Sequence, residues 1–161
     1  MRHEIDPVHC DAASAGLRPA EASDIPALLA IEEQCFPTDR MTRRNFRYAI
    51  LQAKGVVLVA DCQGCPAAYG VVGFHAGTRL ARLTSFAVDP AHRGQGVARR
   101  LLAALEDAAA AHGCRAMRLE VRQDNAAAIG LYTAAGYRCF DTYPAYYEDD
   151  MAALRLEKPL P

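Results

Sequence analysis

The chain has 161 residues, 52% of them hydrophobic and 23% charged, a composition typical of one globular domain and not of an intrinsically disordered chain. Its 18 Lys and Arg residues are balanced by 19 Asp and Glu residues, so no global positive field exists to hold nucleic acid or an anionic membrane surface. We therefore expect neither nucleic acid nor a membrane as a partner.

Residues 1–15 show no hydrophobic period and are expected to form an N-terminal extension, which leaves residues 16–161 as a single domain. The segment lacks the apolar core of a signal peptide. No apolar run in the chain approaches the roughly 18 residues that a membrane-spanning helix needs. These features favour a cytoplasmic protein.

The first half of the domain predicts a strand, two helices and three further strands. Ser23 is expected to cap the first helix, which ends at Cys35, and Thr42 is expected to cap the second, which ends before Gly55. The last three strands follow one another closely, so an antiparallel meander is the simplest arrangement for them. The predicted strands cover residues 17–19, 56–61, 67–75 and 79–89.

Cys62 and Cys65 have the spacing of a metal-ligand pair. A structural zinc site needs four ligands, and the chain holds no second pair of this kind to complete it. The pattern fits better the turn of a β-hairpin, with Gln63 and Gly64 between two apolar runs. We expect no bound metal.

The second half alternates helices and strands. Gly113 is expected to end one helix, and Asn125 is expected to cap another that runs to Ala135. A mixed sheet with helices on both faces, a three-layer α/β domain, accommodates this order of elements. The predictions are a helix over residues 96–112 and strands over residues 115–121, 137–142 and 151–157.

The strongest local signal for chemistry is a glycine-containing loop, residues 93–99, between a strand and a helix. Glycines let the backbone approach a ligand closely, and the first N–H groups of a helix attract an anion. Arg93 and Arg99 add positive charge, so the loop suits a phosphate or pyrophosphate. The alternative is a plain turn before a helix. A dinucleotide fold lacks its third glycine here, and a phosphate-binding P-loop lacks its Gly-Lys-Ser/Thr.

The loop sequence Arg93-Gly94-Gln95-Gly96-Val97-Ala98 resembles the signature of the GCN5-related N-acetyltransferases (GNAT). Within that superfamily the second half of the chain resembles the ribosomal-protein-alanine N-acetyltransferases, the RimI-like group. The resemblance implies the GNAT fold, a mostly antiparallel sheet of about seven strands flanked by about four helices. The matching stretches, in order, are residues 86–90, 119–122, 125–129, 131–132, 136–137 and 146–147.

This resemblance implies acetyl-CoA as the co-substrate. It places backbone contacts to the pantetheine arm at Phe86, Ala87 and Val88, whose N–H groups would also hold the acetyl carbonyl oxygen. Asn125 matches an asparagine that contacts the arm or the substrate, and its alternative role is that of a helix cap alone. The pyrophosphate is expected on the loop formed by Arg93, Gly94, Gln95, Gly96, Val97, Ala98 and Arg99.

Two residues match catalytic positions of the family. Glu120 matches the general base; its alternative is a surface carboxylate paired with Arg118 and Arg122 on its own strand. Tyr132 matches the position of the general acid. A phenol suits this role because its pKa of about 10 keeps it protonated at neutral pH, so that it can donate to a departing thiolate. The alternative is an amphipathic core tyrosine. Tyr132 follows Asn125 by seven residues, or two helical turns, which predicts that both face the same side.

The acceptor side is expected to include Phe36 and Arg40, and the pair Tyr146 and Tyr147, which would clamp the first residues of a peptide. The loop after Phe36 departs from the RimI-like pattern, because Asp39 and Arg40 stand where an aromatic side chain is common.

The resulting expectation is an acetyl-CoA-dependent N-acetyltransferase acting on the terminal amine of a protein or peptide, with a ribosomal protein among the candidates. The alternatives are a lysine side chain, a small amine such as an antibiotic or polyamine, and a non-catalytic acyl-CoA-binding module. A monomer or weak homodimer is expected.

Overall fold

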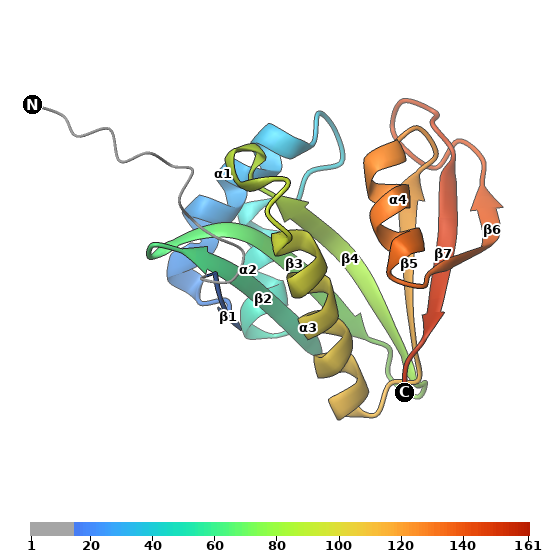
Figure 1. Ribbon diagram of the computed structural model, residues 1–161, viewed down its shortest axis with the longest axis horizontal. Helices are drawn as coiled ribbons and strands as arrows, with labels where there is room; N and C mark the ends of the chain where they lie inside the picture. Colours follow the sequence, from blue (N-terminus) through green and yellow to red (C-terminus); the bar gives the residue numbers. More distant parts are fainter. Residues whose placement is uncertain (1–14) are drawn as a thin grey trace, which may run out of the picture.

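The computed structural model describes residues 15–161. Seven strands form one sheet in the order β1-β2-β3-β4-β5-β7-β6, and five of its six strand pairings are antiparallel, whereas β4 and β5 pair in parallel (Figure 1). This confirms the expected α/β fold. The strands are β1 (Gly16–Pro19), β2 (Gly55–Cys62), β3 (Cys65–Phe74), β4 (Leu80–Val88), β5 (Ala116–Arg122), β6 (Arg138–Tyr143) and β7 (Ala153–Pro159).

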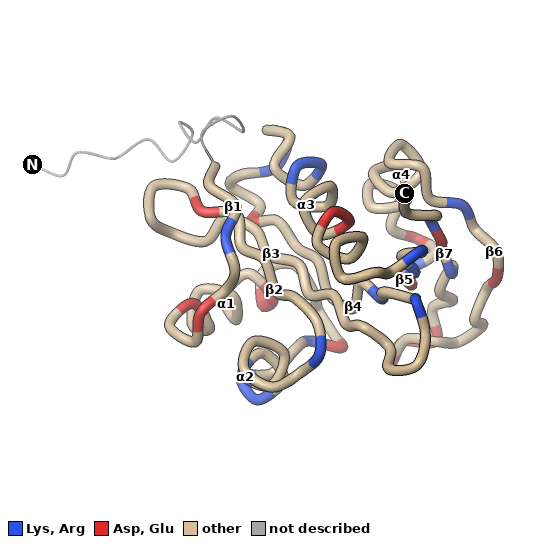
Figure 2. Tube along the Cα trace, turned by 90° about the horizontal axis from the view of Figure 1, so that it is seen from below, with Lys and Arg blue, Asp and Glu red and all other residues tan. Residues whose placement is uncertain are grey.

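The helices cover both faces of the sheet, as Figure 2 shows. One core packs α3 and α4 against one face, and a second core packs α1 and α2 against the other. Among residues 15–161, no helix combines the length and apolarity needed to cross a bilayer. The helices are α1 (Ile25–Cys35), α2 (Arg43–Leu51), α3 (Val97–His112) and α4 (Ala126–Ala134).

Three of the four predicted helix caps are confirmed. Thr42 accepts a hydrogen bond from the Asn45 backbone N–H, Asn125 accepts one from Ala128, and Gly113 ends α3 in the left-handed region. The expectation that Ser23 caps α1 is wrong, because a short 3-10 turn, Ala22–Asp24, precedes that helix. Asp24 occupies the cap position, but its carboxylate binds Arg18 and the Glu21 N–H instead.

The β2–β3 hairpin turns at Gln63 and Gly64, whose φ angles are 53° and 83°. Two consecutive residues with positive φ are typical of the tight hairpin turns that match strand twist. This confirms the hairpin interpretation of the Cys62–Cys65 spacing, and Cys65 is a free thiol. The proposed N-terminal extension lies outside the described residues except for Ala15, which is buried and accepts a hydrogen bond from Arg100.

The feature that positions the site is a divergence between β4 and β5. These strands pair in parallel only from Leu80–Ala116 to Leu83–Leu119. Directly afterwards the β3–β4 register shifts, because Val72 pairs with Leu83 but Val71 pairs with Ser85, which leaves Thr84 as the extra residue of a β-bulge. A bulge bends its strand. The later part of β4 therefore turns away from β5, as Figure 1 shows.

Candidate active site

A cavity of about 450 Å³ occupies the divergence between β4 and β5. Its walls come from α1 and the loop after it, from both diverging strands, from the start of α4 and from the loop between β6 and β7. The lining residues used below are Glu32, Phe36, Asp39, Met41, Ser85, Phe86, Glu120, Arg122, Asn125, Tyr132 and Tyr147. Leu119 and Val121 also line it, so the cavity reaches both faces of the sheet, because alternate residues of a strand point to opposite faces.

Glu120 lies in this cavity with a side chain only 10% exposed. Its carboxylate is 3.0 Å from the Arg82 guanidinium of β4 and 3.8 Å from that of Arg155 of β7. The alternative interpretation of Glu120, a surface carboxylate paired with Arg118 and Arg122, is wrong, because those two arginines pair with other carboxylates. The side chains of facing residues on adjacent strands lie about 4.5–5.5 Å apart, closer than residues two apart on one strand, and Arg155 stands opposite Glu120 in the β5–β7 register.

Tyr132 of α4 is 7% exposed and lies among aromatic rings. The ring centroids of Phe86 and Tyr137 are 6.4 Å and 5.7 Å from its own, both in edge-on geometry. Burial raises the pKa of Tyr132 well above that of a free phenol, so the hydroxyl stays protonated at neutral pH. Asn125 and Tyr132 both line the cavity, as their seven-residue spacing predicts, and Asn125 also caps α4.

The glycine loop lies at the end of β4, where it leads into α3. Gly94 and Gly96 have φ angles of 79° and 77°, and Gly96 is the N-terminal cap residue of the helix. Glycine adopts this left-handed conformation without strain. The backbone N–H groups of the first turn of α3 are therefore open to an anion, whereas the Val97 side chain is 2% exposed and belongs to the core.

The residues predicted to bind the cofactor are divided between the cavity wall and the surface near this loop. Arg93 is exposed and donates to the Val88 carbonyl at 3.4 Å and to the Cys35 sulfur at 3.3 Å. Ala87 is buried toward α1, so only its backbone faces the divergence. The cavity lining brings together Phe86 and Asn125 and leaves out the residues at positions 87, 88 and 93–99.

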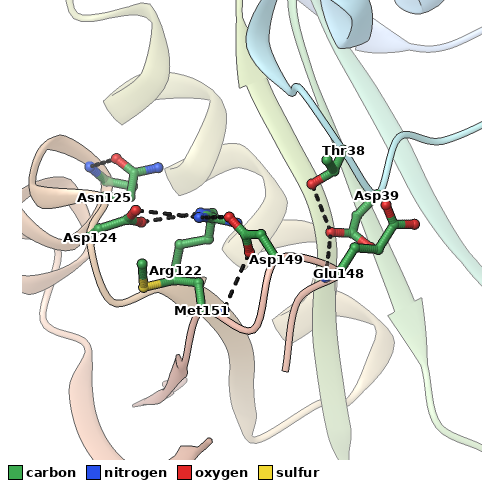
Figure 3. Close-up of polar contacts among 9 residues, drawn as sticks. Thr38, Asp39, Arg122, Asp124, Asn125, Glu148, Asp149 and Met151 are labelled. Atoms are coloured by element: carbon green, nitrogen blue, oxygen red, sulfur yellow. Dashed lines mark hydrogen bonds and ion pairs between the residues drawn. The ribbon is translucent and has the colours of Figure 1, made fainter. Parts of the chain in front are cut away.

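The two loops predicted from the sequence to lie on the acceptor side meet at the cavity. The Asp39 carboxylate, in the loop between α1 and α2, accepts a hydrogen bond of 3.5 Å from the Glu148 N–H in the loop between β6 and β7 (Figure 3). Arg122 of β5 anchors the second loop through Asp149 at 2.6 Å and also pairs with Asp124 at 3.1 Å (Figure 3). The Asp39–Glu148 contact joins two segments that lie more than 100 residues apart in the sequence, so that both form one wall of the cavity.

The predicted tyrosine pair is divided between two environments. Tyr147 lines the cavity, lies 5.0 Å from the Arg122 guanidinium and has a pKa that burial raises to about 12. Tyr146 is exposed, stacks on Tyr143 and accepts a 3.4 Å hydrogen bond from Arg82. Phe36 lines the cavity, whereas Arg40 does not and instead donates to the Phe36 carbonyl.

Sequence reasoning missed Glu32, a buried carboxyl group in the cavity wall. Its carboxylate accepts hydrogen bonds from Tyr69 Oη, from Ser85 Oγ at 2.9 Å and from the Met41 N–H at 2.9 Å. Burial raises its pKa, which these donors partly oppose. The sequence does contain a sign of this residue, because Glu32 follows Leu28 and Leu29 on the apolar side of α1. A carboxylate on that side is buried on folding, which is costly unless it is hydrogen-bonded.

The arrangement combines three elements of acyl-transfer chemistry. The Glu120 carboxylate of β5 and the protonated Tyr132 phenol of α4 line the cavity, and the N-terminus of α3, with its unpaired N–H groups, follows the end of β4. A carboxylate can take a proton from a nucleophile, and a phenol can give one to a leaving group. The helix terminus can hold a phosphate-bearing group whose reactive end reaches the cavity.

Comparison with known proteins agrees with this chemistry. Residues 25–137 match the family model described as "Acetyltransferase (GNAT) family". The structure is similar to that of the ribosomal-protein-S18-alanine N-acetyltransferase of Escherichia coli, with 28% identity, a TM-score of 0.82, and coverage of 91% of this chain and 94% of that one. No curated protein sequence matches significantly.

Two further solved structures are similar. Ard1 from Thermoplasma volcanium has 26% identity and a TM-score of 0.80 over 91% of this chain and 98% of that one. The putative acetyltransferase yncA from Salmonella typhimurium, solved with acetyl-CoA, has 23% identity and a TM-score of 0.77 over 91% of this chain and 94% of that one, which shows a common fold.

Proposed function

Since the chain belongs to the acetyltransferase (GNAT) family, we propose that it acetylates the N-terminal amino group of a protein or peptide. The protein is an acetyl-CoA-dependent N-acetyltransferase, and the choice of acceptor is the part that we infer. The choice of acceptor rests on the cavity wall that the Asp39–Glu148 contact forms together with Tyr147. Such a wall suits the end of an extended chain. The similarity to an enzyme that acts on a ribosomal-protein alanine supports the same acceptor class.

We place acetyl-CoA with its pyrophosphate on the N–H groups of residues 94–99 and its arm along Phe86, Ala87 and Val88. The fit rests on the positive φ angles of Gly94 and Gly96, which leave the loop without side chains that would block a phosphate. Arg93 and Arg99 are exposed beside this loop and supply positive charge. Every residue invoked lies within residues 16–161, which we propose as the catalytic unit.

In the proposed reaction, acetyl-CoA supplies a thioester carbonyl that the acceptor amine attacks. Glu120 takes the proton that the amine loses, directly or through water, and its two arginine neighbours keep the carboxylate in place. Tyr132 donates its proton to the departing sulfur, since burial holds that hydroxyl protonated. Asn125 and Tyr147 also line the cavity, where we assign Asn125 to the cofactor arm and Tyr147 to the acceptor.

The test is release of CoA from acetyl-CoA by the purified protein with four kinds of acceptor. These are peptides with a free N-terminus, the same peptides with a blocked N-terminus, lysine-bearing blocked peptides, and simple amines such as polyamines. Turnover confined to free N-termini supports the proposal. Turnover on lysine or small amines alone would contradict it, and acetyl-CoA binding without turnover on any amine would favour a non-catalytic binding module.

A further inference from the structure

The segment from Arg40 to Lys54 is strongly cationic. It contains Arg40, Arg43, Arg44, Arg47 and Lys54, and no Asp or Glu. All five side chains are exposed, and Figure 2 shows blue Lys and Arg positions along α2. Within residues 15–161, none of the five forms an ion pair, whereas five arginines of the sheet do, namely Arg18, Arg82, Arg118, Arg122 and Arg155. The charge of α2 is therefore left uncompensated by the fold.

Four side chains of α2 form one outward stripe, which we call the α2 stripe: Arg44, Arg47, Tyr48 and Leu51. Their spacing of i, i+3, i+4 and i+7 places them on one side of a helix, and the buried Phe46 holds the opposite side in the core. Tyr48 is 59% exposed and Leu51 is 53% exposed, among the most exposed large apolar side chains of the described residues. Arginine and tyrosine are enriched where proteins bind other polypeptides.

The α2 stripe lies close to the acceptor side of the cavity. Met41 lines the cavity, and α2 begins two residues later at Arg43. The helix has nine residues and is therefore about 13 Å long, a distance that about four extended residues span. If three residues join a terminal amine at Glu120 to the start of α2, the residues from about the fourth to the eighth would lie along this helix.

We propose that the α2 stripe binds an acidic, partly apolar segment of the acceptor polypeptide, a few residues after its N-terminus. This inference rests on the proposed N-terminal acceptor and adds a substrate class to it. The uncompensated arginines account for the acidic character, and Tyr48 and Leu51 account for apolar contacts. Nucleic acid fits less well, since the chain as a whole carries a net charge of −1 and the cationic segment is confined to one short helix and its flanks.

The test compares three peptides with the same first three residues and with glutamate, glutamine or lysine at positions 4 to 8. We expect kcat/KM to be about 5- to 10-fold higher for the acidic peptide than for the neutral one, through a lower KM, because two or three exposed ion pairs form. Raising the salt concentration from 50 to 500 mM should remove most of this preference, since exposed charges are then screened.

The matched variants are a double change, Arg44→Gln with Arg47→Gln, and a control, Arg138→Gln. Arg138 is also exposed, but it lies at the start of β6. The double variant should treat the acidic and neutral peptides alike while keeping the wild-type rate on the neutral one, and the control should keep the preference. Because all three side chains are exposed, each variant should fold, which a thermal melt verifies.

The outcomes separate this inference from the proposed function. If free N-termini are acetylated without any preference for acidic residues, the inference is wrong and the proposed function stands. If no N-terminal peptide is turned over but other amines are, the proposed function itself fails. If added RNA inhibits the wild type but not the double variant, and peptide charge has no effect, α2 binds nucleic acid and the inference is overturned.

Discussion

Glu120 carries the largest predicted effect of any single residue. Replacing it with glutamine keeps the shape of the side chain and removes the proton acceptor, so kcat should fall about 100- to 1000-fold with little change in the KM for acetyl-CoA. The matched control is Glu157→Gln. Like Glu120, Glu157 pairs with an arginine, in its case Arg118 at 2.5 Å, but Glu157 does not line the cavity. Steady-state CoA release measures both variants. Equal losses in the two would argue that ion pairing, and not proton transfer, explains the effect.

Tyr132 makes a prediction about pH. Burial raises its pKa above the value of about 10 for a free phenol, so the protonated form persists to higher pH than in an exposed tyrosine. The plot of kcat against pH should therefore show no falling limb from this group between pH 6 and 10. Tyr132→Phe should lower kcat about 100-fold across that range. A limb near pH 9 that disappears in the variant would contradict the raised pKa of Tyr132, and an unchanged kcat in the variant would contradict its assignment as general acid.

Glu32 joins the two sides of the cavity, because one carboxylate holds Met41 of the acceptor loop and Ser85 of β4. In Glu32→Leu both carboxylate oxygens are lost, so the Met41 N–H has no acceptor and the loop after α1 should loosen. We expect the KM for the acceptor to rise about 5-fold, which corresponds to the free energy of one hydrogen bond. The KM for acetyl-CoA should stay unchanged. Glu33→Gln, the exposed neighbour on α1, should alter neither value.

At the level of elements, we propose that the start of α3 holds the pyrophosphate of acetyl-CoA. Gly96 adopts a φ of 77°, where alanine is disfavoured by about 1–2 kcal/mol. Gly96→Ala should therefore distort the first turn and raise the KM for acetyl-CoA about 10-fold. The control is Gly130→Ala in α4, where an added methyl group meets nothing within 4 Å and should stabilise the helix by about 0.5–1 kcal/mol. An unchanged KM in the first variant would move the pyrophosphate away from this loop.

The order of the elements could be predicted from the sequence, because each has a clear period and a recognisable end. Thr42, Asn125 and Gly113 act through neighbouring backbone groups, so local sequence was sufficient to identify them as caps. Boundaries were less certain. The second helix, expected up to Gly55, ends at Leu51, and the last two strands begin one and two residues later than expected.

Contacts between elements could not be predicted in the same way. The partners of Glu120 depend on the register of three strands, which alternation within one strand does not specify. The bulge at Thr84 also carries no glycine or proline to mark it, although it opens the cavity. Glu32 shows the same limit, because its position on α1 was visible while its neighbours Tyr69 and Ser85 come from distant strands.

On the scale of the whole molecule, the sheet consists of two parts joined through four residue pairs between β4 and β5. A ligand that fills the divergence binds both parts at once and should stabilise the folded protein. Acetyl-CoA at 100 times its Kd should raise the free energy of unfolding by about 2.7 kcal/mol, or the melting temperature by about 5–10 °C. A thermal melt tests this, with adenosine 3′,5′-bisphosphate, which lacks the arm, as a weaker control. No shift with either compound would contradict the proposed binding mode.

The cavity has one further consequence, which concerns the order of events in turnover. Leu119 and Val121 face α3 and α4, while Glu120 and Arg122 face the acceptor loops, so the cavity passes through the sheet. In the proposed reaction the donor enters from one face of the sheet and the acceptor from the other, so neither blocks the path of its counterpart. Direct transfer within a ternary complex then needs no acetylated enzyme. Double-reciprocal plots of the initial rate against one substrate, at several fixed concentrations of the other, should therefore intersect instead of running parallel.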